Sequence, residues 1–128
     1  MKTKLTITIL AVLNVLQGIG FVLGGELLTK QSFPKDMVTE ESIQVGAAMH
    51  WPLGVAFIAT GIIFFSMRSL QIMEAKKLLL YTGFAYVFFL INGLLQNFTT
   101  PVIVPKPAIV LITLLAALSL YTSRTAKA

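Results

Sequence analysis

The sequence predicts an all-α integral membrane protein, a single-domain bundle of four transmembrane helices with both termini in the cytoplasm. Hydrophobic residues make up 56% of the chain and charged residues only 12%, whereas soluble domains are nearer half apolar and a quarter charged. The mean hydropathy is +0.86. The apolar residues are gathered into long blocks, and most of the basic residues flank those blocks on one side. These observations favour membrane spans over a soluble core.

Each expected span supplies about 20 residues, the length that crosses roughly 30 Å of hydrocarbon. The spans cover about residues 5–28, 43–67, 78–97 and 102–122. The first block follows the basic segment MKTK as in a signal peptide, but no small-x-small cleavage site follows, so an uncleaved span is expected. The fourth span has two possible starts, Val102 and Pro107, because the link FTTPVIVPKP before it is rich in proline.

The distribution of charge sets the predicted orientation. Seven basic residues fall on the side of the termini, namely Lys2, Lys4, Arg68, Lys76, Lys77, Arg124 and Lys127. Four of the five acids fall on the other side, at Glu26, Asp36, Glu40 and Glu41. Cytoplasmic loops carry the excess of Lys and Arg, so both termini are expected in the cytoplasm. The expected location is the cytoplasmic (plasma) membrane of a prokaryote.

The second span contains the stretch GAAMHWPLG, with the chain's one histidine and one tryptophan. A helix starting at Pro52 and ending at Met67 would be only about 24 Å long, too short to cross the hydrocarbon. The helix is therefore expected to begin near Ser42 or Ile43, with Ser42 as a possible N-cap, and to contain Pro52 in its interior. His50 then lies in the outer part of the membrane. Trp51 suits the outer aromatic belt.

Polar residues inside the spans suggest where helices meet or a ligand binds. The first span carries Asn14 and Gln17 near mid-membrane, and the third carries Asn92 and Gln96 on one face. Amides in lipid are costly without a partner, so these side chains are expected to face protein or water. A ligand-binding pocket in the outer half is hypothesised, lined by Gln17, His50, Asn92 and Gln96, with Glu26 and Trp51 nearby. Helix packing is assigned to Gly20, Gly24, Gly54 and Gly61, of which the first two form a GxxxG pair.

The favoured interpretation of His50 is a simple hydrogen bond to a neighbour at the interface. The alternatives are a ligand-binding or proton-transfer role and, less favoured, ligation of haem or a metal. The chain has no cysteine and one histidine, so it offers no conventional metal site, and no cofactor is indicated. No G-x-S-x-G, HExxH or phosphate-cradling loop is present. A catalytic role would rest on His50 and Glu26 alone. The net charge of +5 comes without a basic stripe of interleaved aromatics, which argues against a nucleic-acid partner.

Three segments resemble the DoxX-like small membrane proteins. They are the glycine-bearing end of the first span (GIGFVLGGELLT), the glycine-spaced second span (GVAFIATGIIFFSMR) and a third span opened by basic residues (AKKLLLYTGFAYVFFLINGL). The resemblance is one of pattern and covers most of the chain. It implies a four-helix bundle of similar length. It transfers no catalytic residue, because the family is functionally mixed, with some members resembling subunits of quinone-linked oxidoreductases.

The leading functional hypothesis is a non-enzymatic membrane protein that acts as a homo-oligomer or as an accessory subunit of a membrane partner. The alternative is a binder or carrier of a small amphipathic molecule, a quinone or a lipid, at the outer pocket. A third hypothesis is an oligomeric pore or transporter. Residues 7–13 and 111–118 are almost bare of polar groups, which argues against a continuous polar path for ions.

Overall fold

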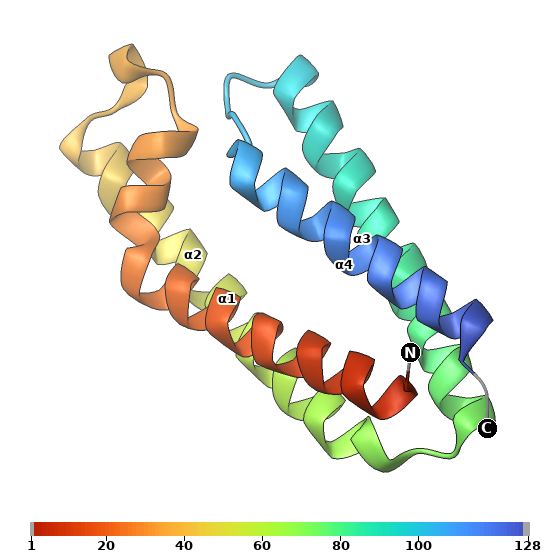
Figure 1. Ribbon diagram of the computed structural model, residues 1–128. Helices are drawn as coiled ribbons and strands as arrows, with labels where there is room; N and C mark the ends of the chain where they lie inside the picture. The colour runs from red at the N-terminus through yellow and green to blue at the C-terminus, as the bar shows by residue number, and fades with distance from the viewer. Residues whose placement is uncertain (1, 127–128) are drawn as a thin grey trace.

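The computed structural model describes residues 2–126, which form four long α-helices (Figure 1). These are α1 (Thr3–Ser32), α2 (Glu40–Ser66), α3 (Ile72–Thr99) and α4 (Lys106–Thr125). Two short 3₁₀ turns lie in the connections, η1 (Lys35–Met37) and η2 (Met67–Ser69). Each of the four helices is long and apolar enough to cross a membrane. The all-α fold with four membrane-length helices is thereby confirmed.

The surface of the helices is apolar in the way that lipid contact requires. Large hydrophobic side chains are exposed on every helix, among them Leu23, Met49, Phe88 and Leu114. In water such a surface would drive aggregation, whereas in a bilayer it meets hydrocarbon. The four candidate spans therefore indicate an integral membrane protein that contacts the lipid bilayer.

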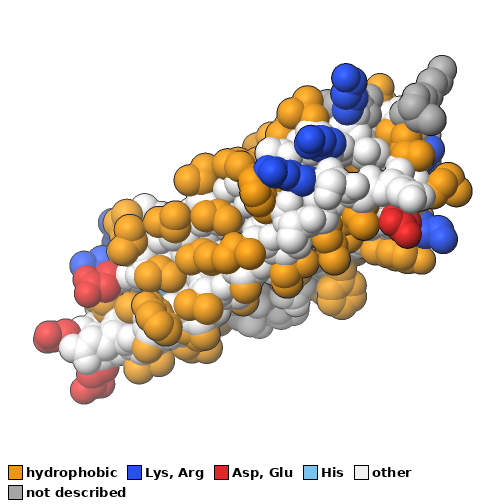
Figure 2. Space-filling model, turned by 90° about the horizontal axis from the view of Figure 1, so that it is seen from below, with side chains coloured by type: hydrophobic (Ala, Val, Ile, Leu, Met, Phe, Trp, Pro, Cys, Tyr) orange, Lys and Arg blue, Asp and Glu red, His pale blue; other side chains and the backbone are white. Residues whose placement is uncertain are grey.

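The charged side chains gather at the two ends of the molecule. Figure 2 shows acidic side chains at the end formed by the connection between α1 and α2, mostly basic ones at the end where the termini lie, and hydrophobic ones between. We call these the acidic end and the basic end. Lys127, assigned to the basic side from the sequence, lies outside the described residues. The placement of the basic end in the cytoplasm stays a prediction.

Helices α1 and α2 form an antiparallel pair held together by small residues. A Cβ atom built on Gly18 would lie 2.5 Å from the Gly54 carbonyl oxygen, and one built on Gly54 would lie 2.6 Å from the Gly18 carbonyl oxygen. The same kind of contact recurs seven residues farther along each helix in both directions. The three contacting pairs are Ala11 with Gly61, Gly18 with Gly54, and Gly25 with Ala47. On each helix these positions are seven residues apart, so each falls on the same face at every second turn.

The predicted GxxxG pair does not take part in this contact. A Cβ atom built on Gly20 or Gly24 meets nothing within 4 Å among the described residues, so no neighbouring helix of residues 2–126 requires a glycine at either position. Gly54 and Gly61, in contrast, lie in the contact between α1 and α2. Packing of Gly20 and Gly24 against a second chain stays a prediction.

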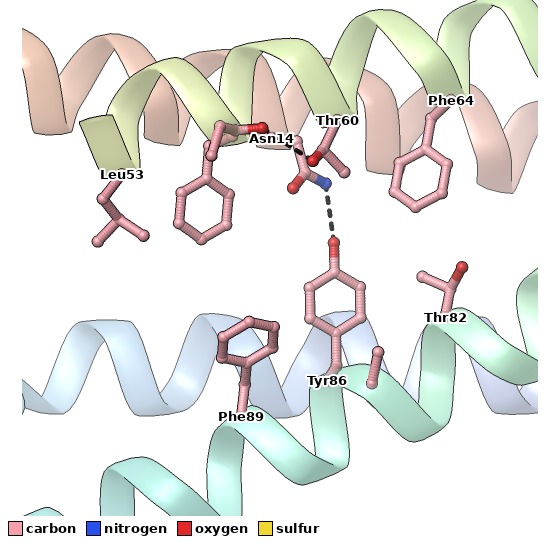
Figure 3. Close-up of a pocket in the computed structure, with 10 residues that line it drawn as sticks. Asn14, Leu53, Thr60, Phe64, Thr82, Tyr86 and Phe89 are labelled. Carbon is pink, nitrogen blue, oxygen red and sulfur yellow. Dashed lines mark hydrogen bonds between the residues drawn. The ribbon is translucent and has the colours of Figure 1, made fainter. Parts of the chain in front are cut away.

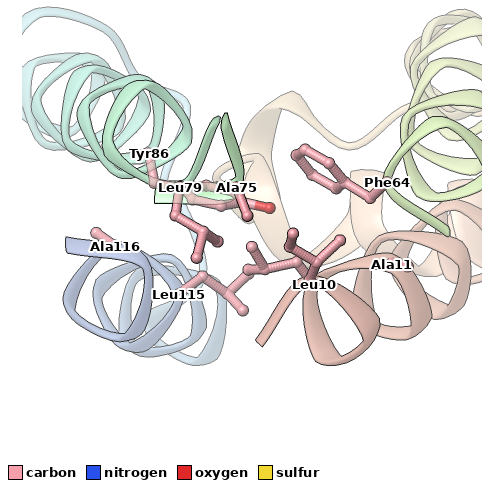
Figure 4. Close-up of a cluster of buried hydrophobic side chains, with 9 residues drawn as sticks. Leu10, Ala11, Phe64, Ala75, Leu79, Tyr86, Leu115 and Ala116 are labelled. Atoms are coloured by element: carbon pink, nitrogen blue, oxygen red, sulfur yellow. The ribbon is translucent and has the colours of Figure 1, made fainter. Parts of the chain in front are cut away.

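Helices α3 and α4 form the second pair, and the two pairs meet mainly near the basic end. Gly83 packs against Leu120 within the second pair, where an added Cβ atom would lie 2.6 Å from that side chain. Between the pairs, Leu10, Leu79 and Leu115 are fully buried and point toward one another (Figure 4). The hydrophobic core therefore joins α1 to α3 and α4, with Phe64 of α2 at its side.

Hydrogen bonds join the two pairs at both ends of the molecule. At the basic end, the hydroxyl groups of Thr6 and Thr122 lie 3.0 Å apart and are buried. At the acidic end, the Ile103 backbone N–H donates to the Ser32 carbonyl oxygen at 2.7 Å. Side-by-side contact between α2 and α3 is sparse, however, and the two helices diverge from η2 (Figure 1).

Two helix starts differ in detail from the sequence-based expectation. Helix α2 begins at Glu40, with Thr39 as its N-cap, and Ser42 completes the capping box instead of being the N-cap itself. A capping box satisfies two backbone N–H groups at once, which favours the earlier start. Helix α4 begins at Lys106, because Pro105 lies just before it and Pro107 falls in its first turn. Pro52 lies inside α2, as expected.

Substitution of Gly54 by leucine should break the pairing of α1 and α2. The new side chain would meet the Gly18 backbone, which has no way to move aside, so we expect a destabilisation of about 3 kcal/mol, the upper part of the range for overpacking. Thermal unfolding in mild detergent, followed by circular dichroism, measures the loss. Gly20→Leu is the matched control and should leave the folding of the single chain unchanged. Equal unfolding temperatures for Gly54→Leu and the parent would contradict the prediction.

Candidate functional site

A crevice lies between α2 and α3, at the middle of the membrane-length segments. Its volume is about 200 Å³. Asn14 of α1 closes it from the side, and α2 and α3 supply the walls (Figure 3). The wall residues of α2 are Leu53, Ala56, Phe57, Thr60 and Phe64, and those of α3 are Thr82, Ala85, Tyr86 and Phe89. No charged side chain is among them.

Asn14 connects the two helix pairs inside this crevice. It is 1% exposed, and its Nδ2 donates to the Leu10 carbonyl oxygen at 2.7 Å and to the Tyr86 hydroxyl oxygen at 2.8 Å. Both N–H groups of the amide are therefore used. Among the described residues, no donor reaches the Oδ1 atom of Asn14. That oxygen remains an acceptor beside the crevice.

Tyr86 reaches across from α3 to meet Asn14. Figure 3 shows its ring standing upright from α3 with the hydroxyl group pointing toward α1 and α2. A phenol has one O–H donor and also accepts hydrogen bonds. Because the oxygen already accepts from Asn14, the hydroxyl proton is left to donate, and within the described chain it has no acceptor.

Thr82 lies one turn before Tyr86 on the same face of α3, and its hydroxyl group is unusual for a helix. The helical residues Thr60, Thr99, Thr113 and Ser119 each donate to the carbonyl oxygen four residues earlier. Thr82 makes no hydrogen bond to any described residue, although it is only 9% exposed. Its side chain lines the crevice (Figure 3). Because the side chain lines the crevice, its hydroxyl group is open to the crevice, and a ligand there would meet a free donor and acceptor.

Aromatic rings form much of the remaining wall. Phe57 and Phe64 come from α2 and Phe89 from α3 (Figure 3). Aromatic faces favour a flat, apolar group packed between them. The crevice thus presents largely apolar walls and three neutral polar groups with unused hydrogen-bonding capacity, which are the Tyr86 and Thr82 hydroxyls and the Asn14 carbonyl oxygen. A fourth polar group, the Thr60 hydroxyl, donates to the Ala56 carbonyl oxygen within its own helix.

His50 supports the wall of the crevice from behind and does not line it. The Phe21 ring of α1 stacks on Phe57 at a centroid distance of 5.4 Å and on His50 at 5.6 Å. The His50 Nδ1 atom lies 2.7 Å from the Gly46 carbonyl oxygen. Since a carbonyl oxygen only accepts, Nδ1 carries the proton. Thr29 Oγ1 lies farther away, 3.5 Å from the same nitrogen.

The other residues of the predicted outer pocket lie in separate places. Asn92 and Gln96 are exposed on α3, in the helix pair that does not carry His50. Gln17 is half-buried, and its Oε1 atom is buried without a hydrogen-bond donor among the described residues. The structure therefore does not bring Gln17, His50, Asn92 and Gln96 around one cavity.

Glu26 and Trp51 both line an open groove of about 710 Å³ near the acidic end. Gly24, Gly25, Ala47, Ala48 and Lys30 also line this groove. Glu26 and Trp51 are both exposed, Trp51 at 60%. An exposed indole beside the charged end is the usual arrangement at a membrane interface. Within residues 2–126, no group of three or more His, Cys, Asp or Glu side chains comes together as a metal site would require.

The sequence contained a partial signal for the observed crevice. Asn14 stood out as an amide at mid-membrane, and Thr82 and Tyr86 are four residues apart in the third span, a spacing that places them on one face. Asn14 was expected to face protein or water, and its hydrogen bond to Tyr86 shows that it faces protein. The spacing within one helix does not show which other helix that face meets, and for this reason the crevice could not be predicted.

Comparisons with protein-family models, with curated proteins and with solved structures gave no match. The comparisons therefore assign no family to the chain. Of the resemblance to DoxX-like proteins, only the four-helix architecture is shown. The chain is a four-helix protein with four membrane-length apolar helices.

The Asn14–Tyr86 hydrogen bond should contribute measurably to the association of the two helix pairs. We expect a coupling free energy of about 1 kcal/mol, because hydrogen bonds between transmembrane helices contribute roughly 0.6 to 1.7 kcal/mol. A double-mutant cycle of Asn14→Leu and Tyr86→Phe, measured by unfolding in detergent, gives this coupling. Additive effects of the two substitutions would contradict the hydrogen bond.

Proposed function

We propose that this chain is an integral membrane protein that binds a neutral amphipathic molecule from the bilayer in the crevice between α2 and α3. The observation that carries the proposal is the group of hydrogen-bonding atoms at Thr82, Tyr86 and Asn14 that no described residue uses, inside a largely apolar crevice. Each of these atoms belongs to a residue that lines the crevice, so a ligand inside it would meet free donors and a free acceptor.

The chemistry of these atoms narrows the class of ligand. The O–H groups of Tyr86 and Thr82 donate to a carbonyl or ether oxygen, and Asn14 Oδ1 accepts from a hydroxyl group. No charged residue lines the crevice, so an ionic headgroup would be desolvated without a counter-charge. A quinone ring fits best, since it is flat, neutral and bears carbonyl oxygens. A lipid with a neutral carbonyl or hydroxyl group is the alternative.

The size of the crevice limits how much of the ligand enters. Pockets that enclose a whole drug-sized molecule have volumes of about 300 to 1,000 Å³, and this crevice has about 200 Å³. A single ring is therefore accommodated between Phe57, Phe64 and Phe89, with its hydrocarbon tail outside. Because both walls belong to membrane-length helices, the tail would extend into the surrounding lipid.

Thr82→Val should weaken ligand binding without weakening the fold. Valine keeps the shape of threonine and removes a hydroxyl group that no described residue uses. We expect a decyl-chain benzoquinone to bind about three- to tenfold more weakly, the effect of one net hydrogen bond. Native mass spectrometry of the protein in mild detergent measures the occupancy across a titration, and thermal unfolding measures the stability.

The matched control for this experiment is Thr113→Val. Thr113 is exposed on α4 and donates to the Ile109 carbonyl oxygen, so the same chemical change there should leave quinone binding unaltered. Tyr86→Phe should weaken binding as Thr82→Val does. A parent protein that retains no quinone, or equal binding by the parent and both crevice variants, would refute the proposed site.

A second candidate function is assembly, as a homo-oligomer or as an accessory subunit. It is favoured by Gly20 and Gly24, where an added Cβ atom would meet no described residue within 4 Å, which leaves room for another helix to approach.

We also propose that the basic end lies in the cytoplasm of a prokaryotic cell, because that end carries the excess of Lys and Arg.

Gly20→Leu tests assembly separately from folding. A Cβ atom at this position would meet no described residue within 4 Å, so we expect the leucine variant to fold as the parent does, while close approach of a second helix would be blocked. Native mass spectrometry should then show a lower oligomeric state than that of the parent. An unchanged oligomeric state would exclude the Gly20–Gly24 face from the assembly.

A further inference from the structure

A second hollow lies at the basic end, between α3 and α4. Its charged lining consists of Lys76 and Lys77 of α3 and Arg124 of α4. Met73, Leu80 and Phe84 supply its apolar lining, and Ser123 completes it. None of these residues lines the crevice between α2 and α3. We call this hollow the basic groove.

The positive charge of the basic groove has little compensation from acids. Glu26, Asp36, Glu40 and Glu41 all lie at the acidic end, a membrane-length helix away. Glu74 is the one acid in the sequence near the groove, and it does not line it. Figure 2 shows this asymmetry of charge along the molecule. A concave surface with several cations and one nearby acid attracts anions.

One hydrogen bond shapes the charged part of the groove. The Lys76 Nζ atom donates to the Ala126 carbonyl oxygen at 3.1 Å, which ties the start of α3 to the end of α4 and leaves two N–H groups of the ammonium available.

The apolar part of the groove continues from the charges toward the middle of the membrane. Leu80 follows Lys76 by one turn on α3, and Phe84 follows Leu80 by another. Both positions lie within the apolar segment of α3. A ligand that fills the groove therefore needs an anionic head at Lys77 and Arg124 and a hydrocarbon chain that extends along Leu80 and Phe84.

We infer that the basic groove binds an anionic phospholipid, with its phosphate between Lys77 and Arg124 and an acyl chain against Leu80 and Phe84. Basic pockets between transmembrane helices suit such headgroups, because the cations neutralise the phosphate while the stems of the side chains stay in apolar surroundings. The inference does not depend on the function proposed for the crevice.

The test is a lipid titration of the full chain in mild detergent, read by native mass spectrometry. Phosphatidylglycerol should bind more tightly than phosphatidylcholine, which carries no net charge. Replacement of both Lys77 and Arg124 by Gln should weaken phosphatidylglycerol binding about thirtyfold, since each cation near the membrane surface contributes about a fivefold factor. Both side chains are exposed, so the fold should be unaffected.

Matched variants show whether position or total charge matters. Lys30→Gln with Lys35→Gln removes the same charge at the acidic end and should leave phosphatidylglycerol binding unchanged. Thr82→Val, which tests the crevice, should also leave it unchanged. Equal binding of the two lipids by the parent, or equal weakening by both double variants, would overturn the inference.

A free phosphate ion could occupy the same position between Lys77 and Arg124 as the phosphate of a lipid. If the site is a lipid site, Phe84→Ala should weaken phosphatidylglycerol binding, and inorganic phosphate at millimolar concentration should not displace the lipid. Phe84 is 56% exposed, so its loss should cost little stability. Displacement by inorganic phosphate together with unchanged binding by Phe84→Ala would identify a free-anion site and overturn the assignment to lipid.

Discussion

The arrangement of this molecule depends on the close contact between α1 and α2. Glycine and alanine at seven-residue steps bring the two backbones so near that a Cβ atom on Gly18 or Gly54 would collide with the opposite carbonyl oxygen. Lipid tails are as apolar as leucine, so helices in a membrane gain little from hydrophobic burial and depend on such close packing. Because α2 packs closely on α1, α3 packs on α4 instead. The crevice between α2 and α3 lies where these two helix pairs meet without close packing.

Polar groups join the two helix pairs, and some of them also belong to the proposed ligand site. The Thr6–Thr122 contact and the Ser32–Ile103 hydrogen bond hold the two pairs together at opposite ends of the molecule. The Asn14–Tyr86 hydrogen bond joins the pairs at mid-length. It leaves the Asn14 amide oxygen free to accept a hydrogen bond and the Tyr86 hydroxyl proton free to donate one. The same two residues thus fix the distance between the pairs and present the atoms that a ligand would meet.

The sequence was sufficient for the number and type of helices, because length and apolar composition alone determine whether a helix spans a membrane. It was less informative about contacts. The GxxxG pair at Gly20 and Gly24 drew attention, whereas the contact within the chain uses Gly18 and Gly25 on another face of α1. Gln17, His50 and Asn92 could be placed at similar depths from helix rise, but depth does not determine which faces meet. Tyr86 was recognisable as a partner only once α1 and α3 had been brought together.

The short connection at η2 has a consequence for the size of molecules that the crevice accepts. Helices α2 and α3 diverge from this turn (Figure 1), and both supply walls of the crevice. If the crevice is the proposed binding site, a narrow group could move closer to η2 than a broad one before it touched both walls. Tyr86 and Thr82 have fixed positions along the α3 wall, so a molecule would need a matching thickness to bring its oxygen to their hydroxyl groups. The turn would then select ligands by width as well as by hydrogen bonding.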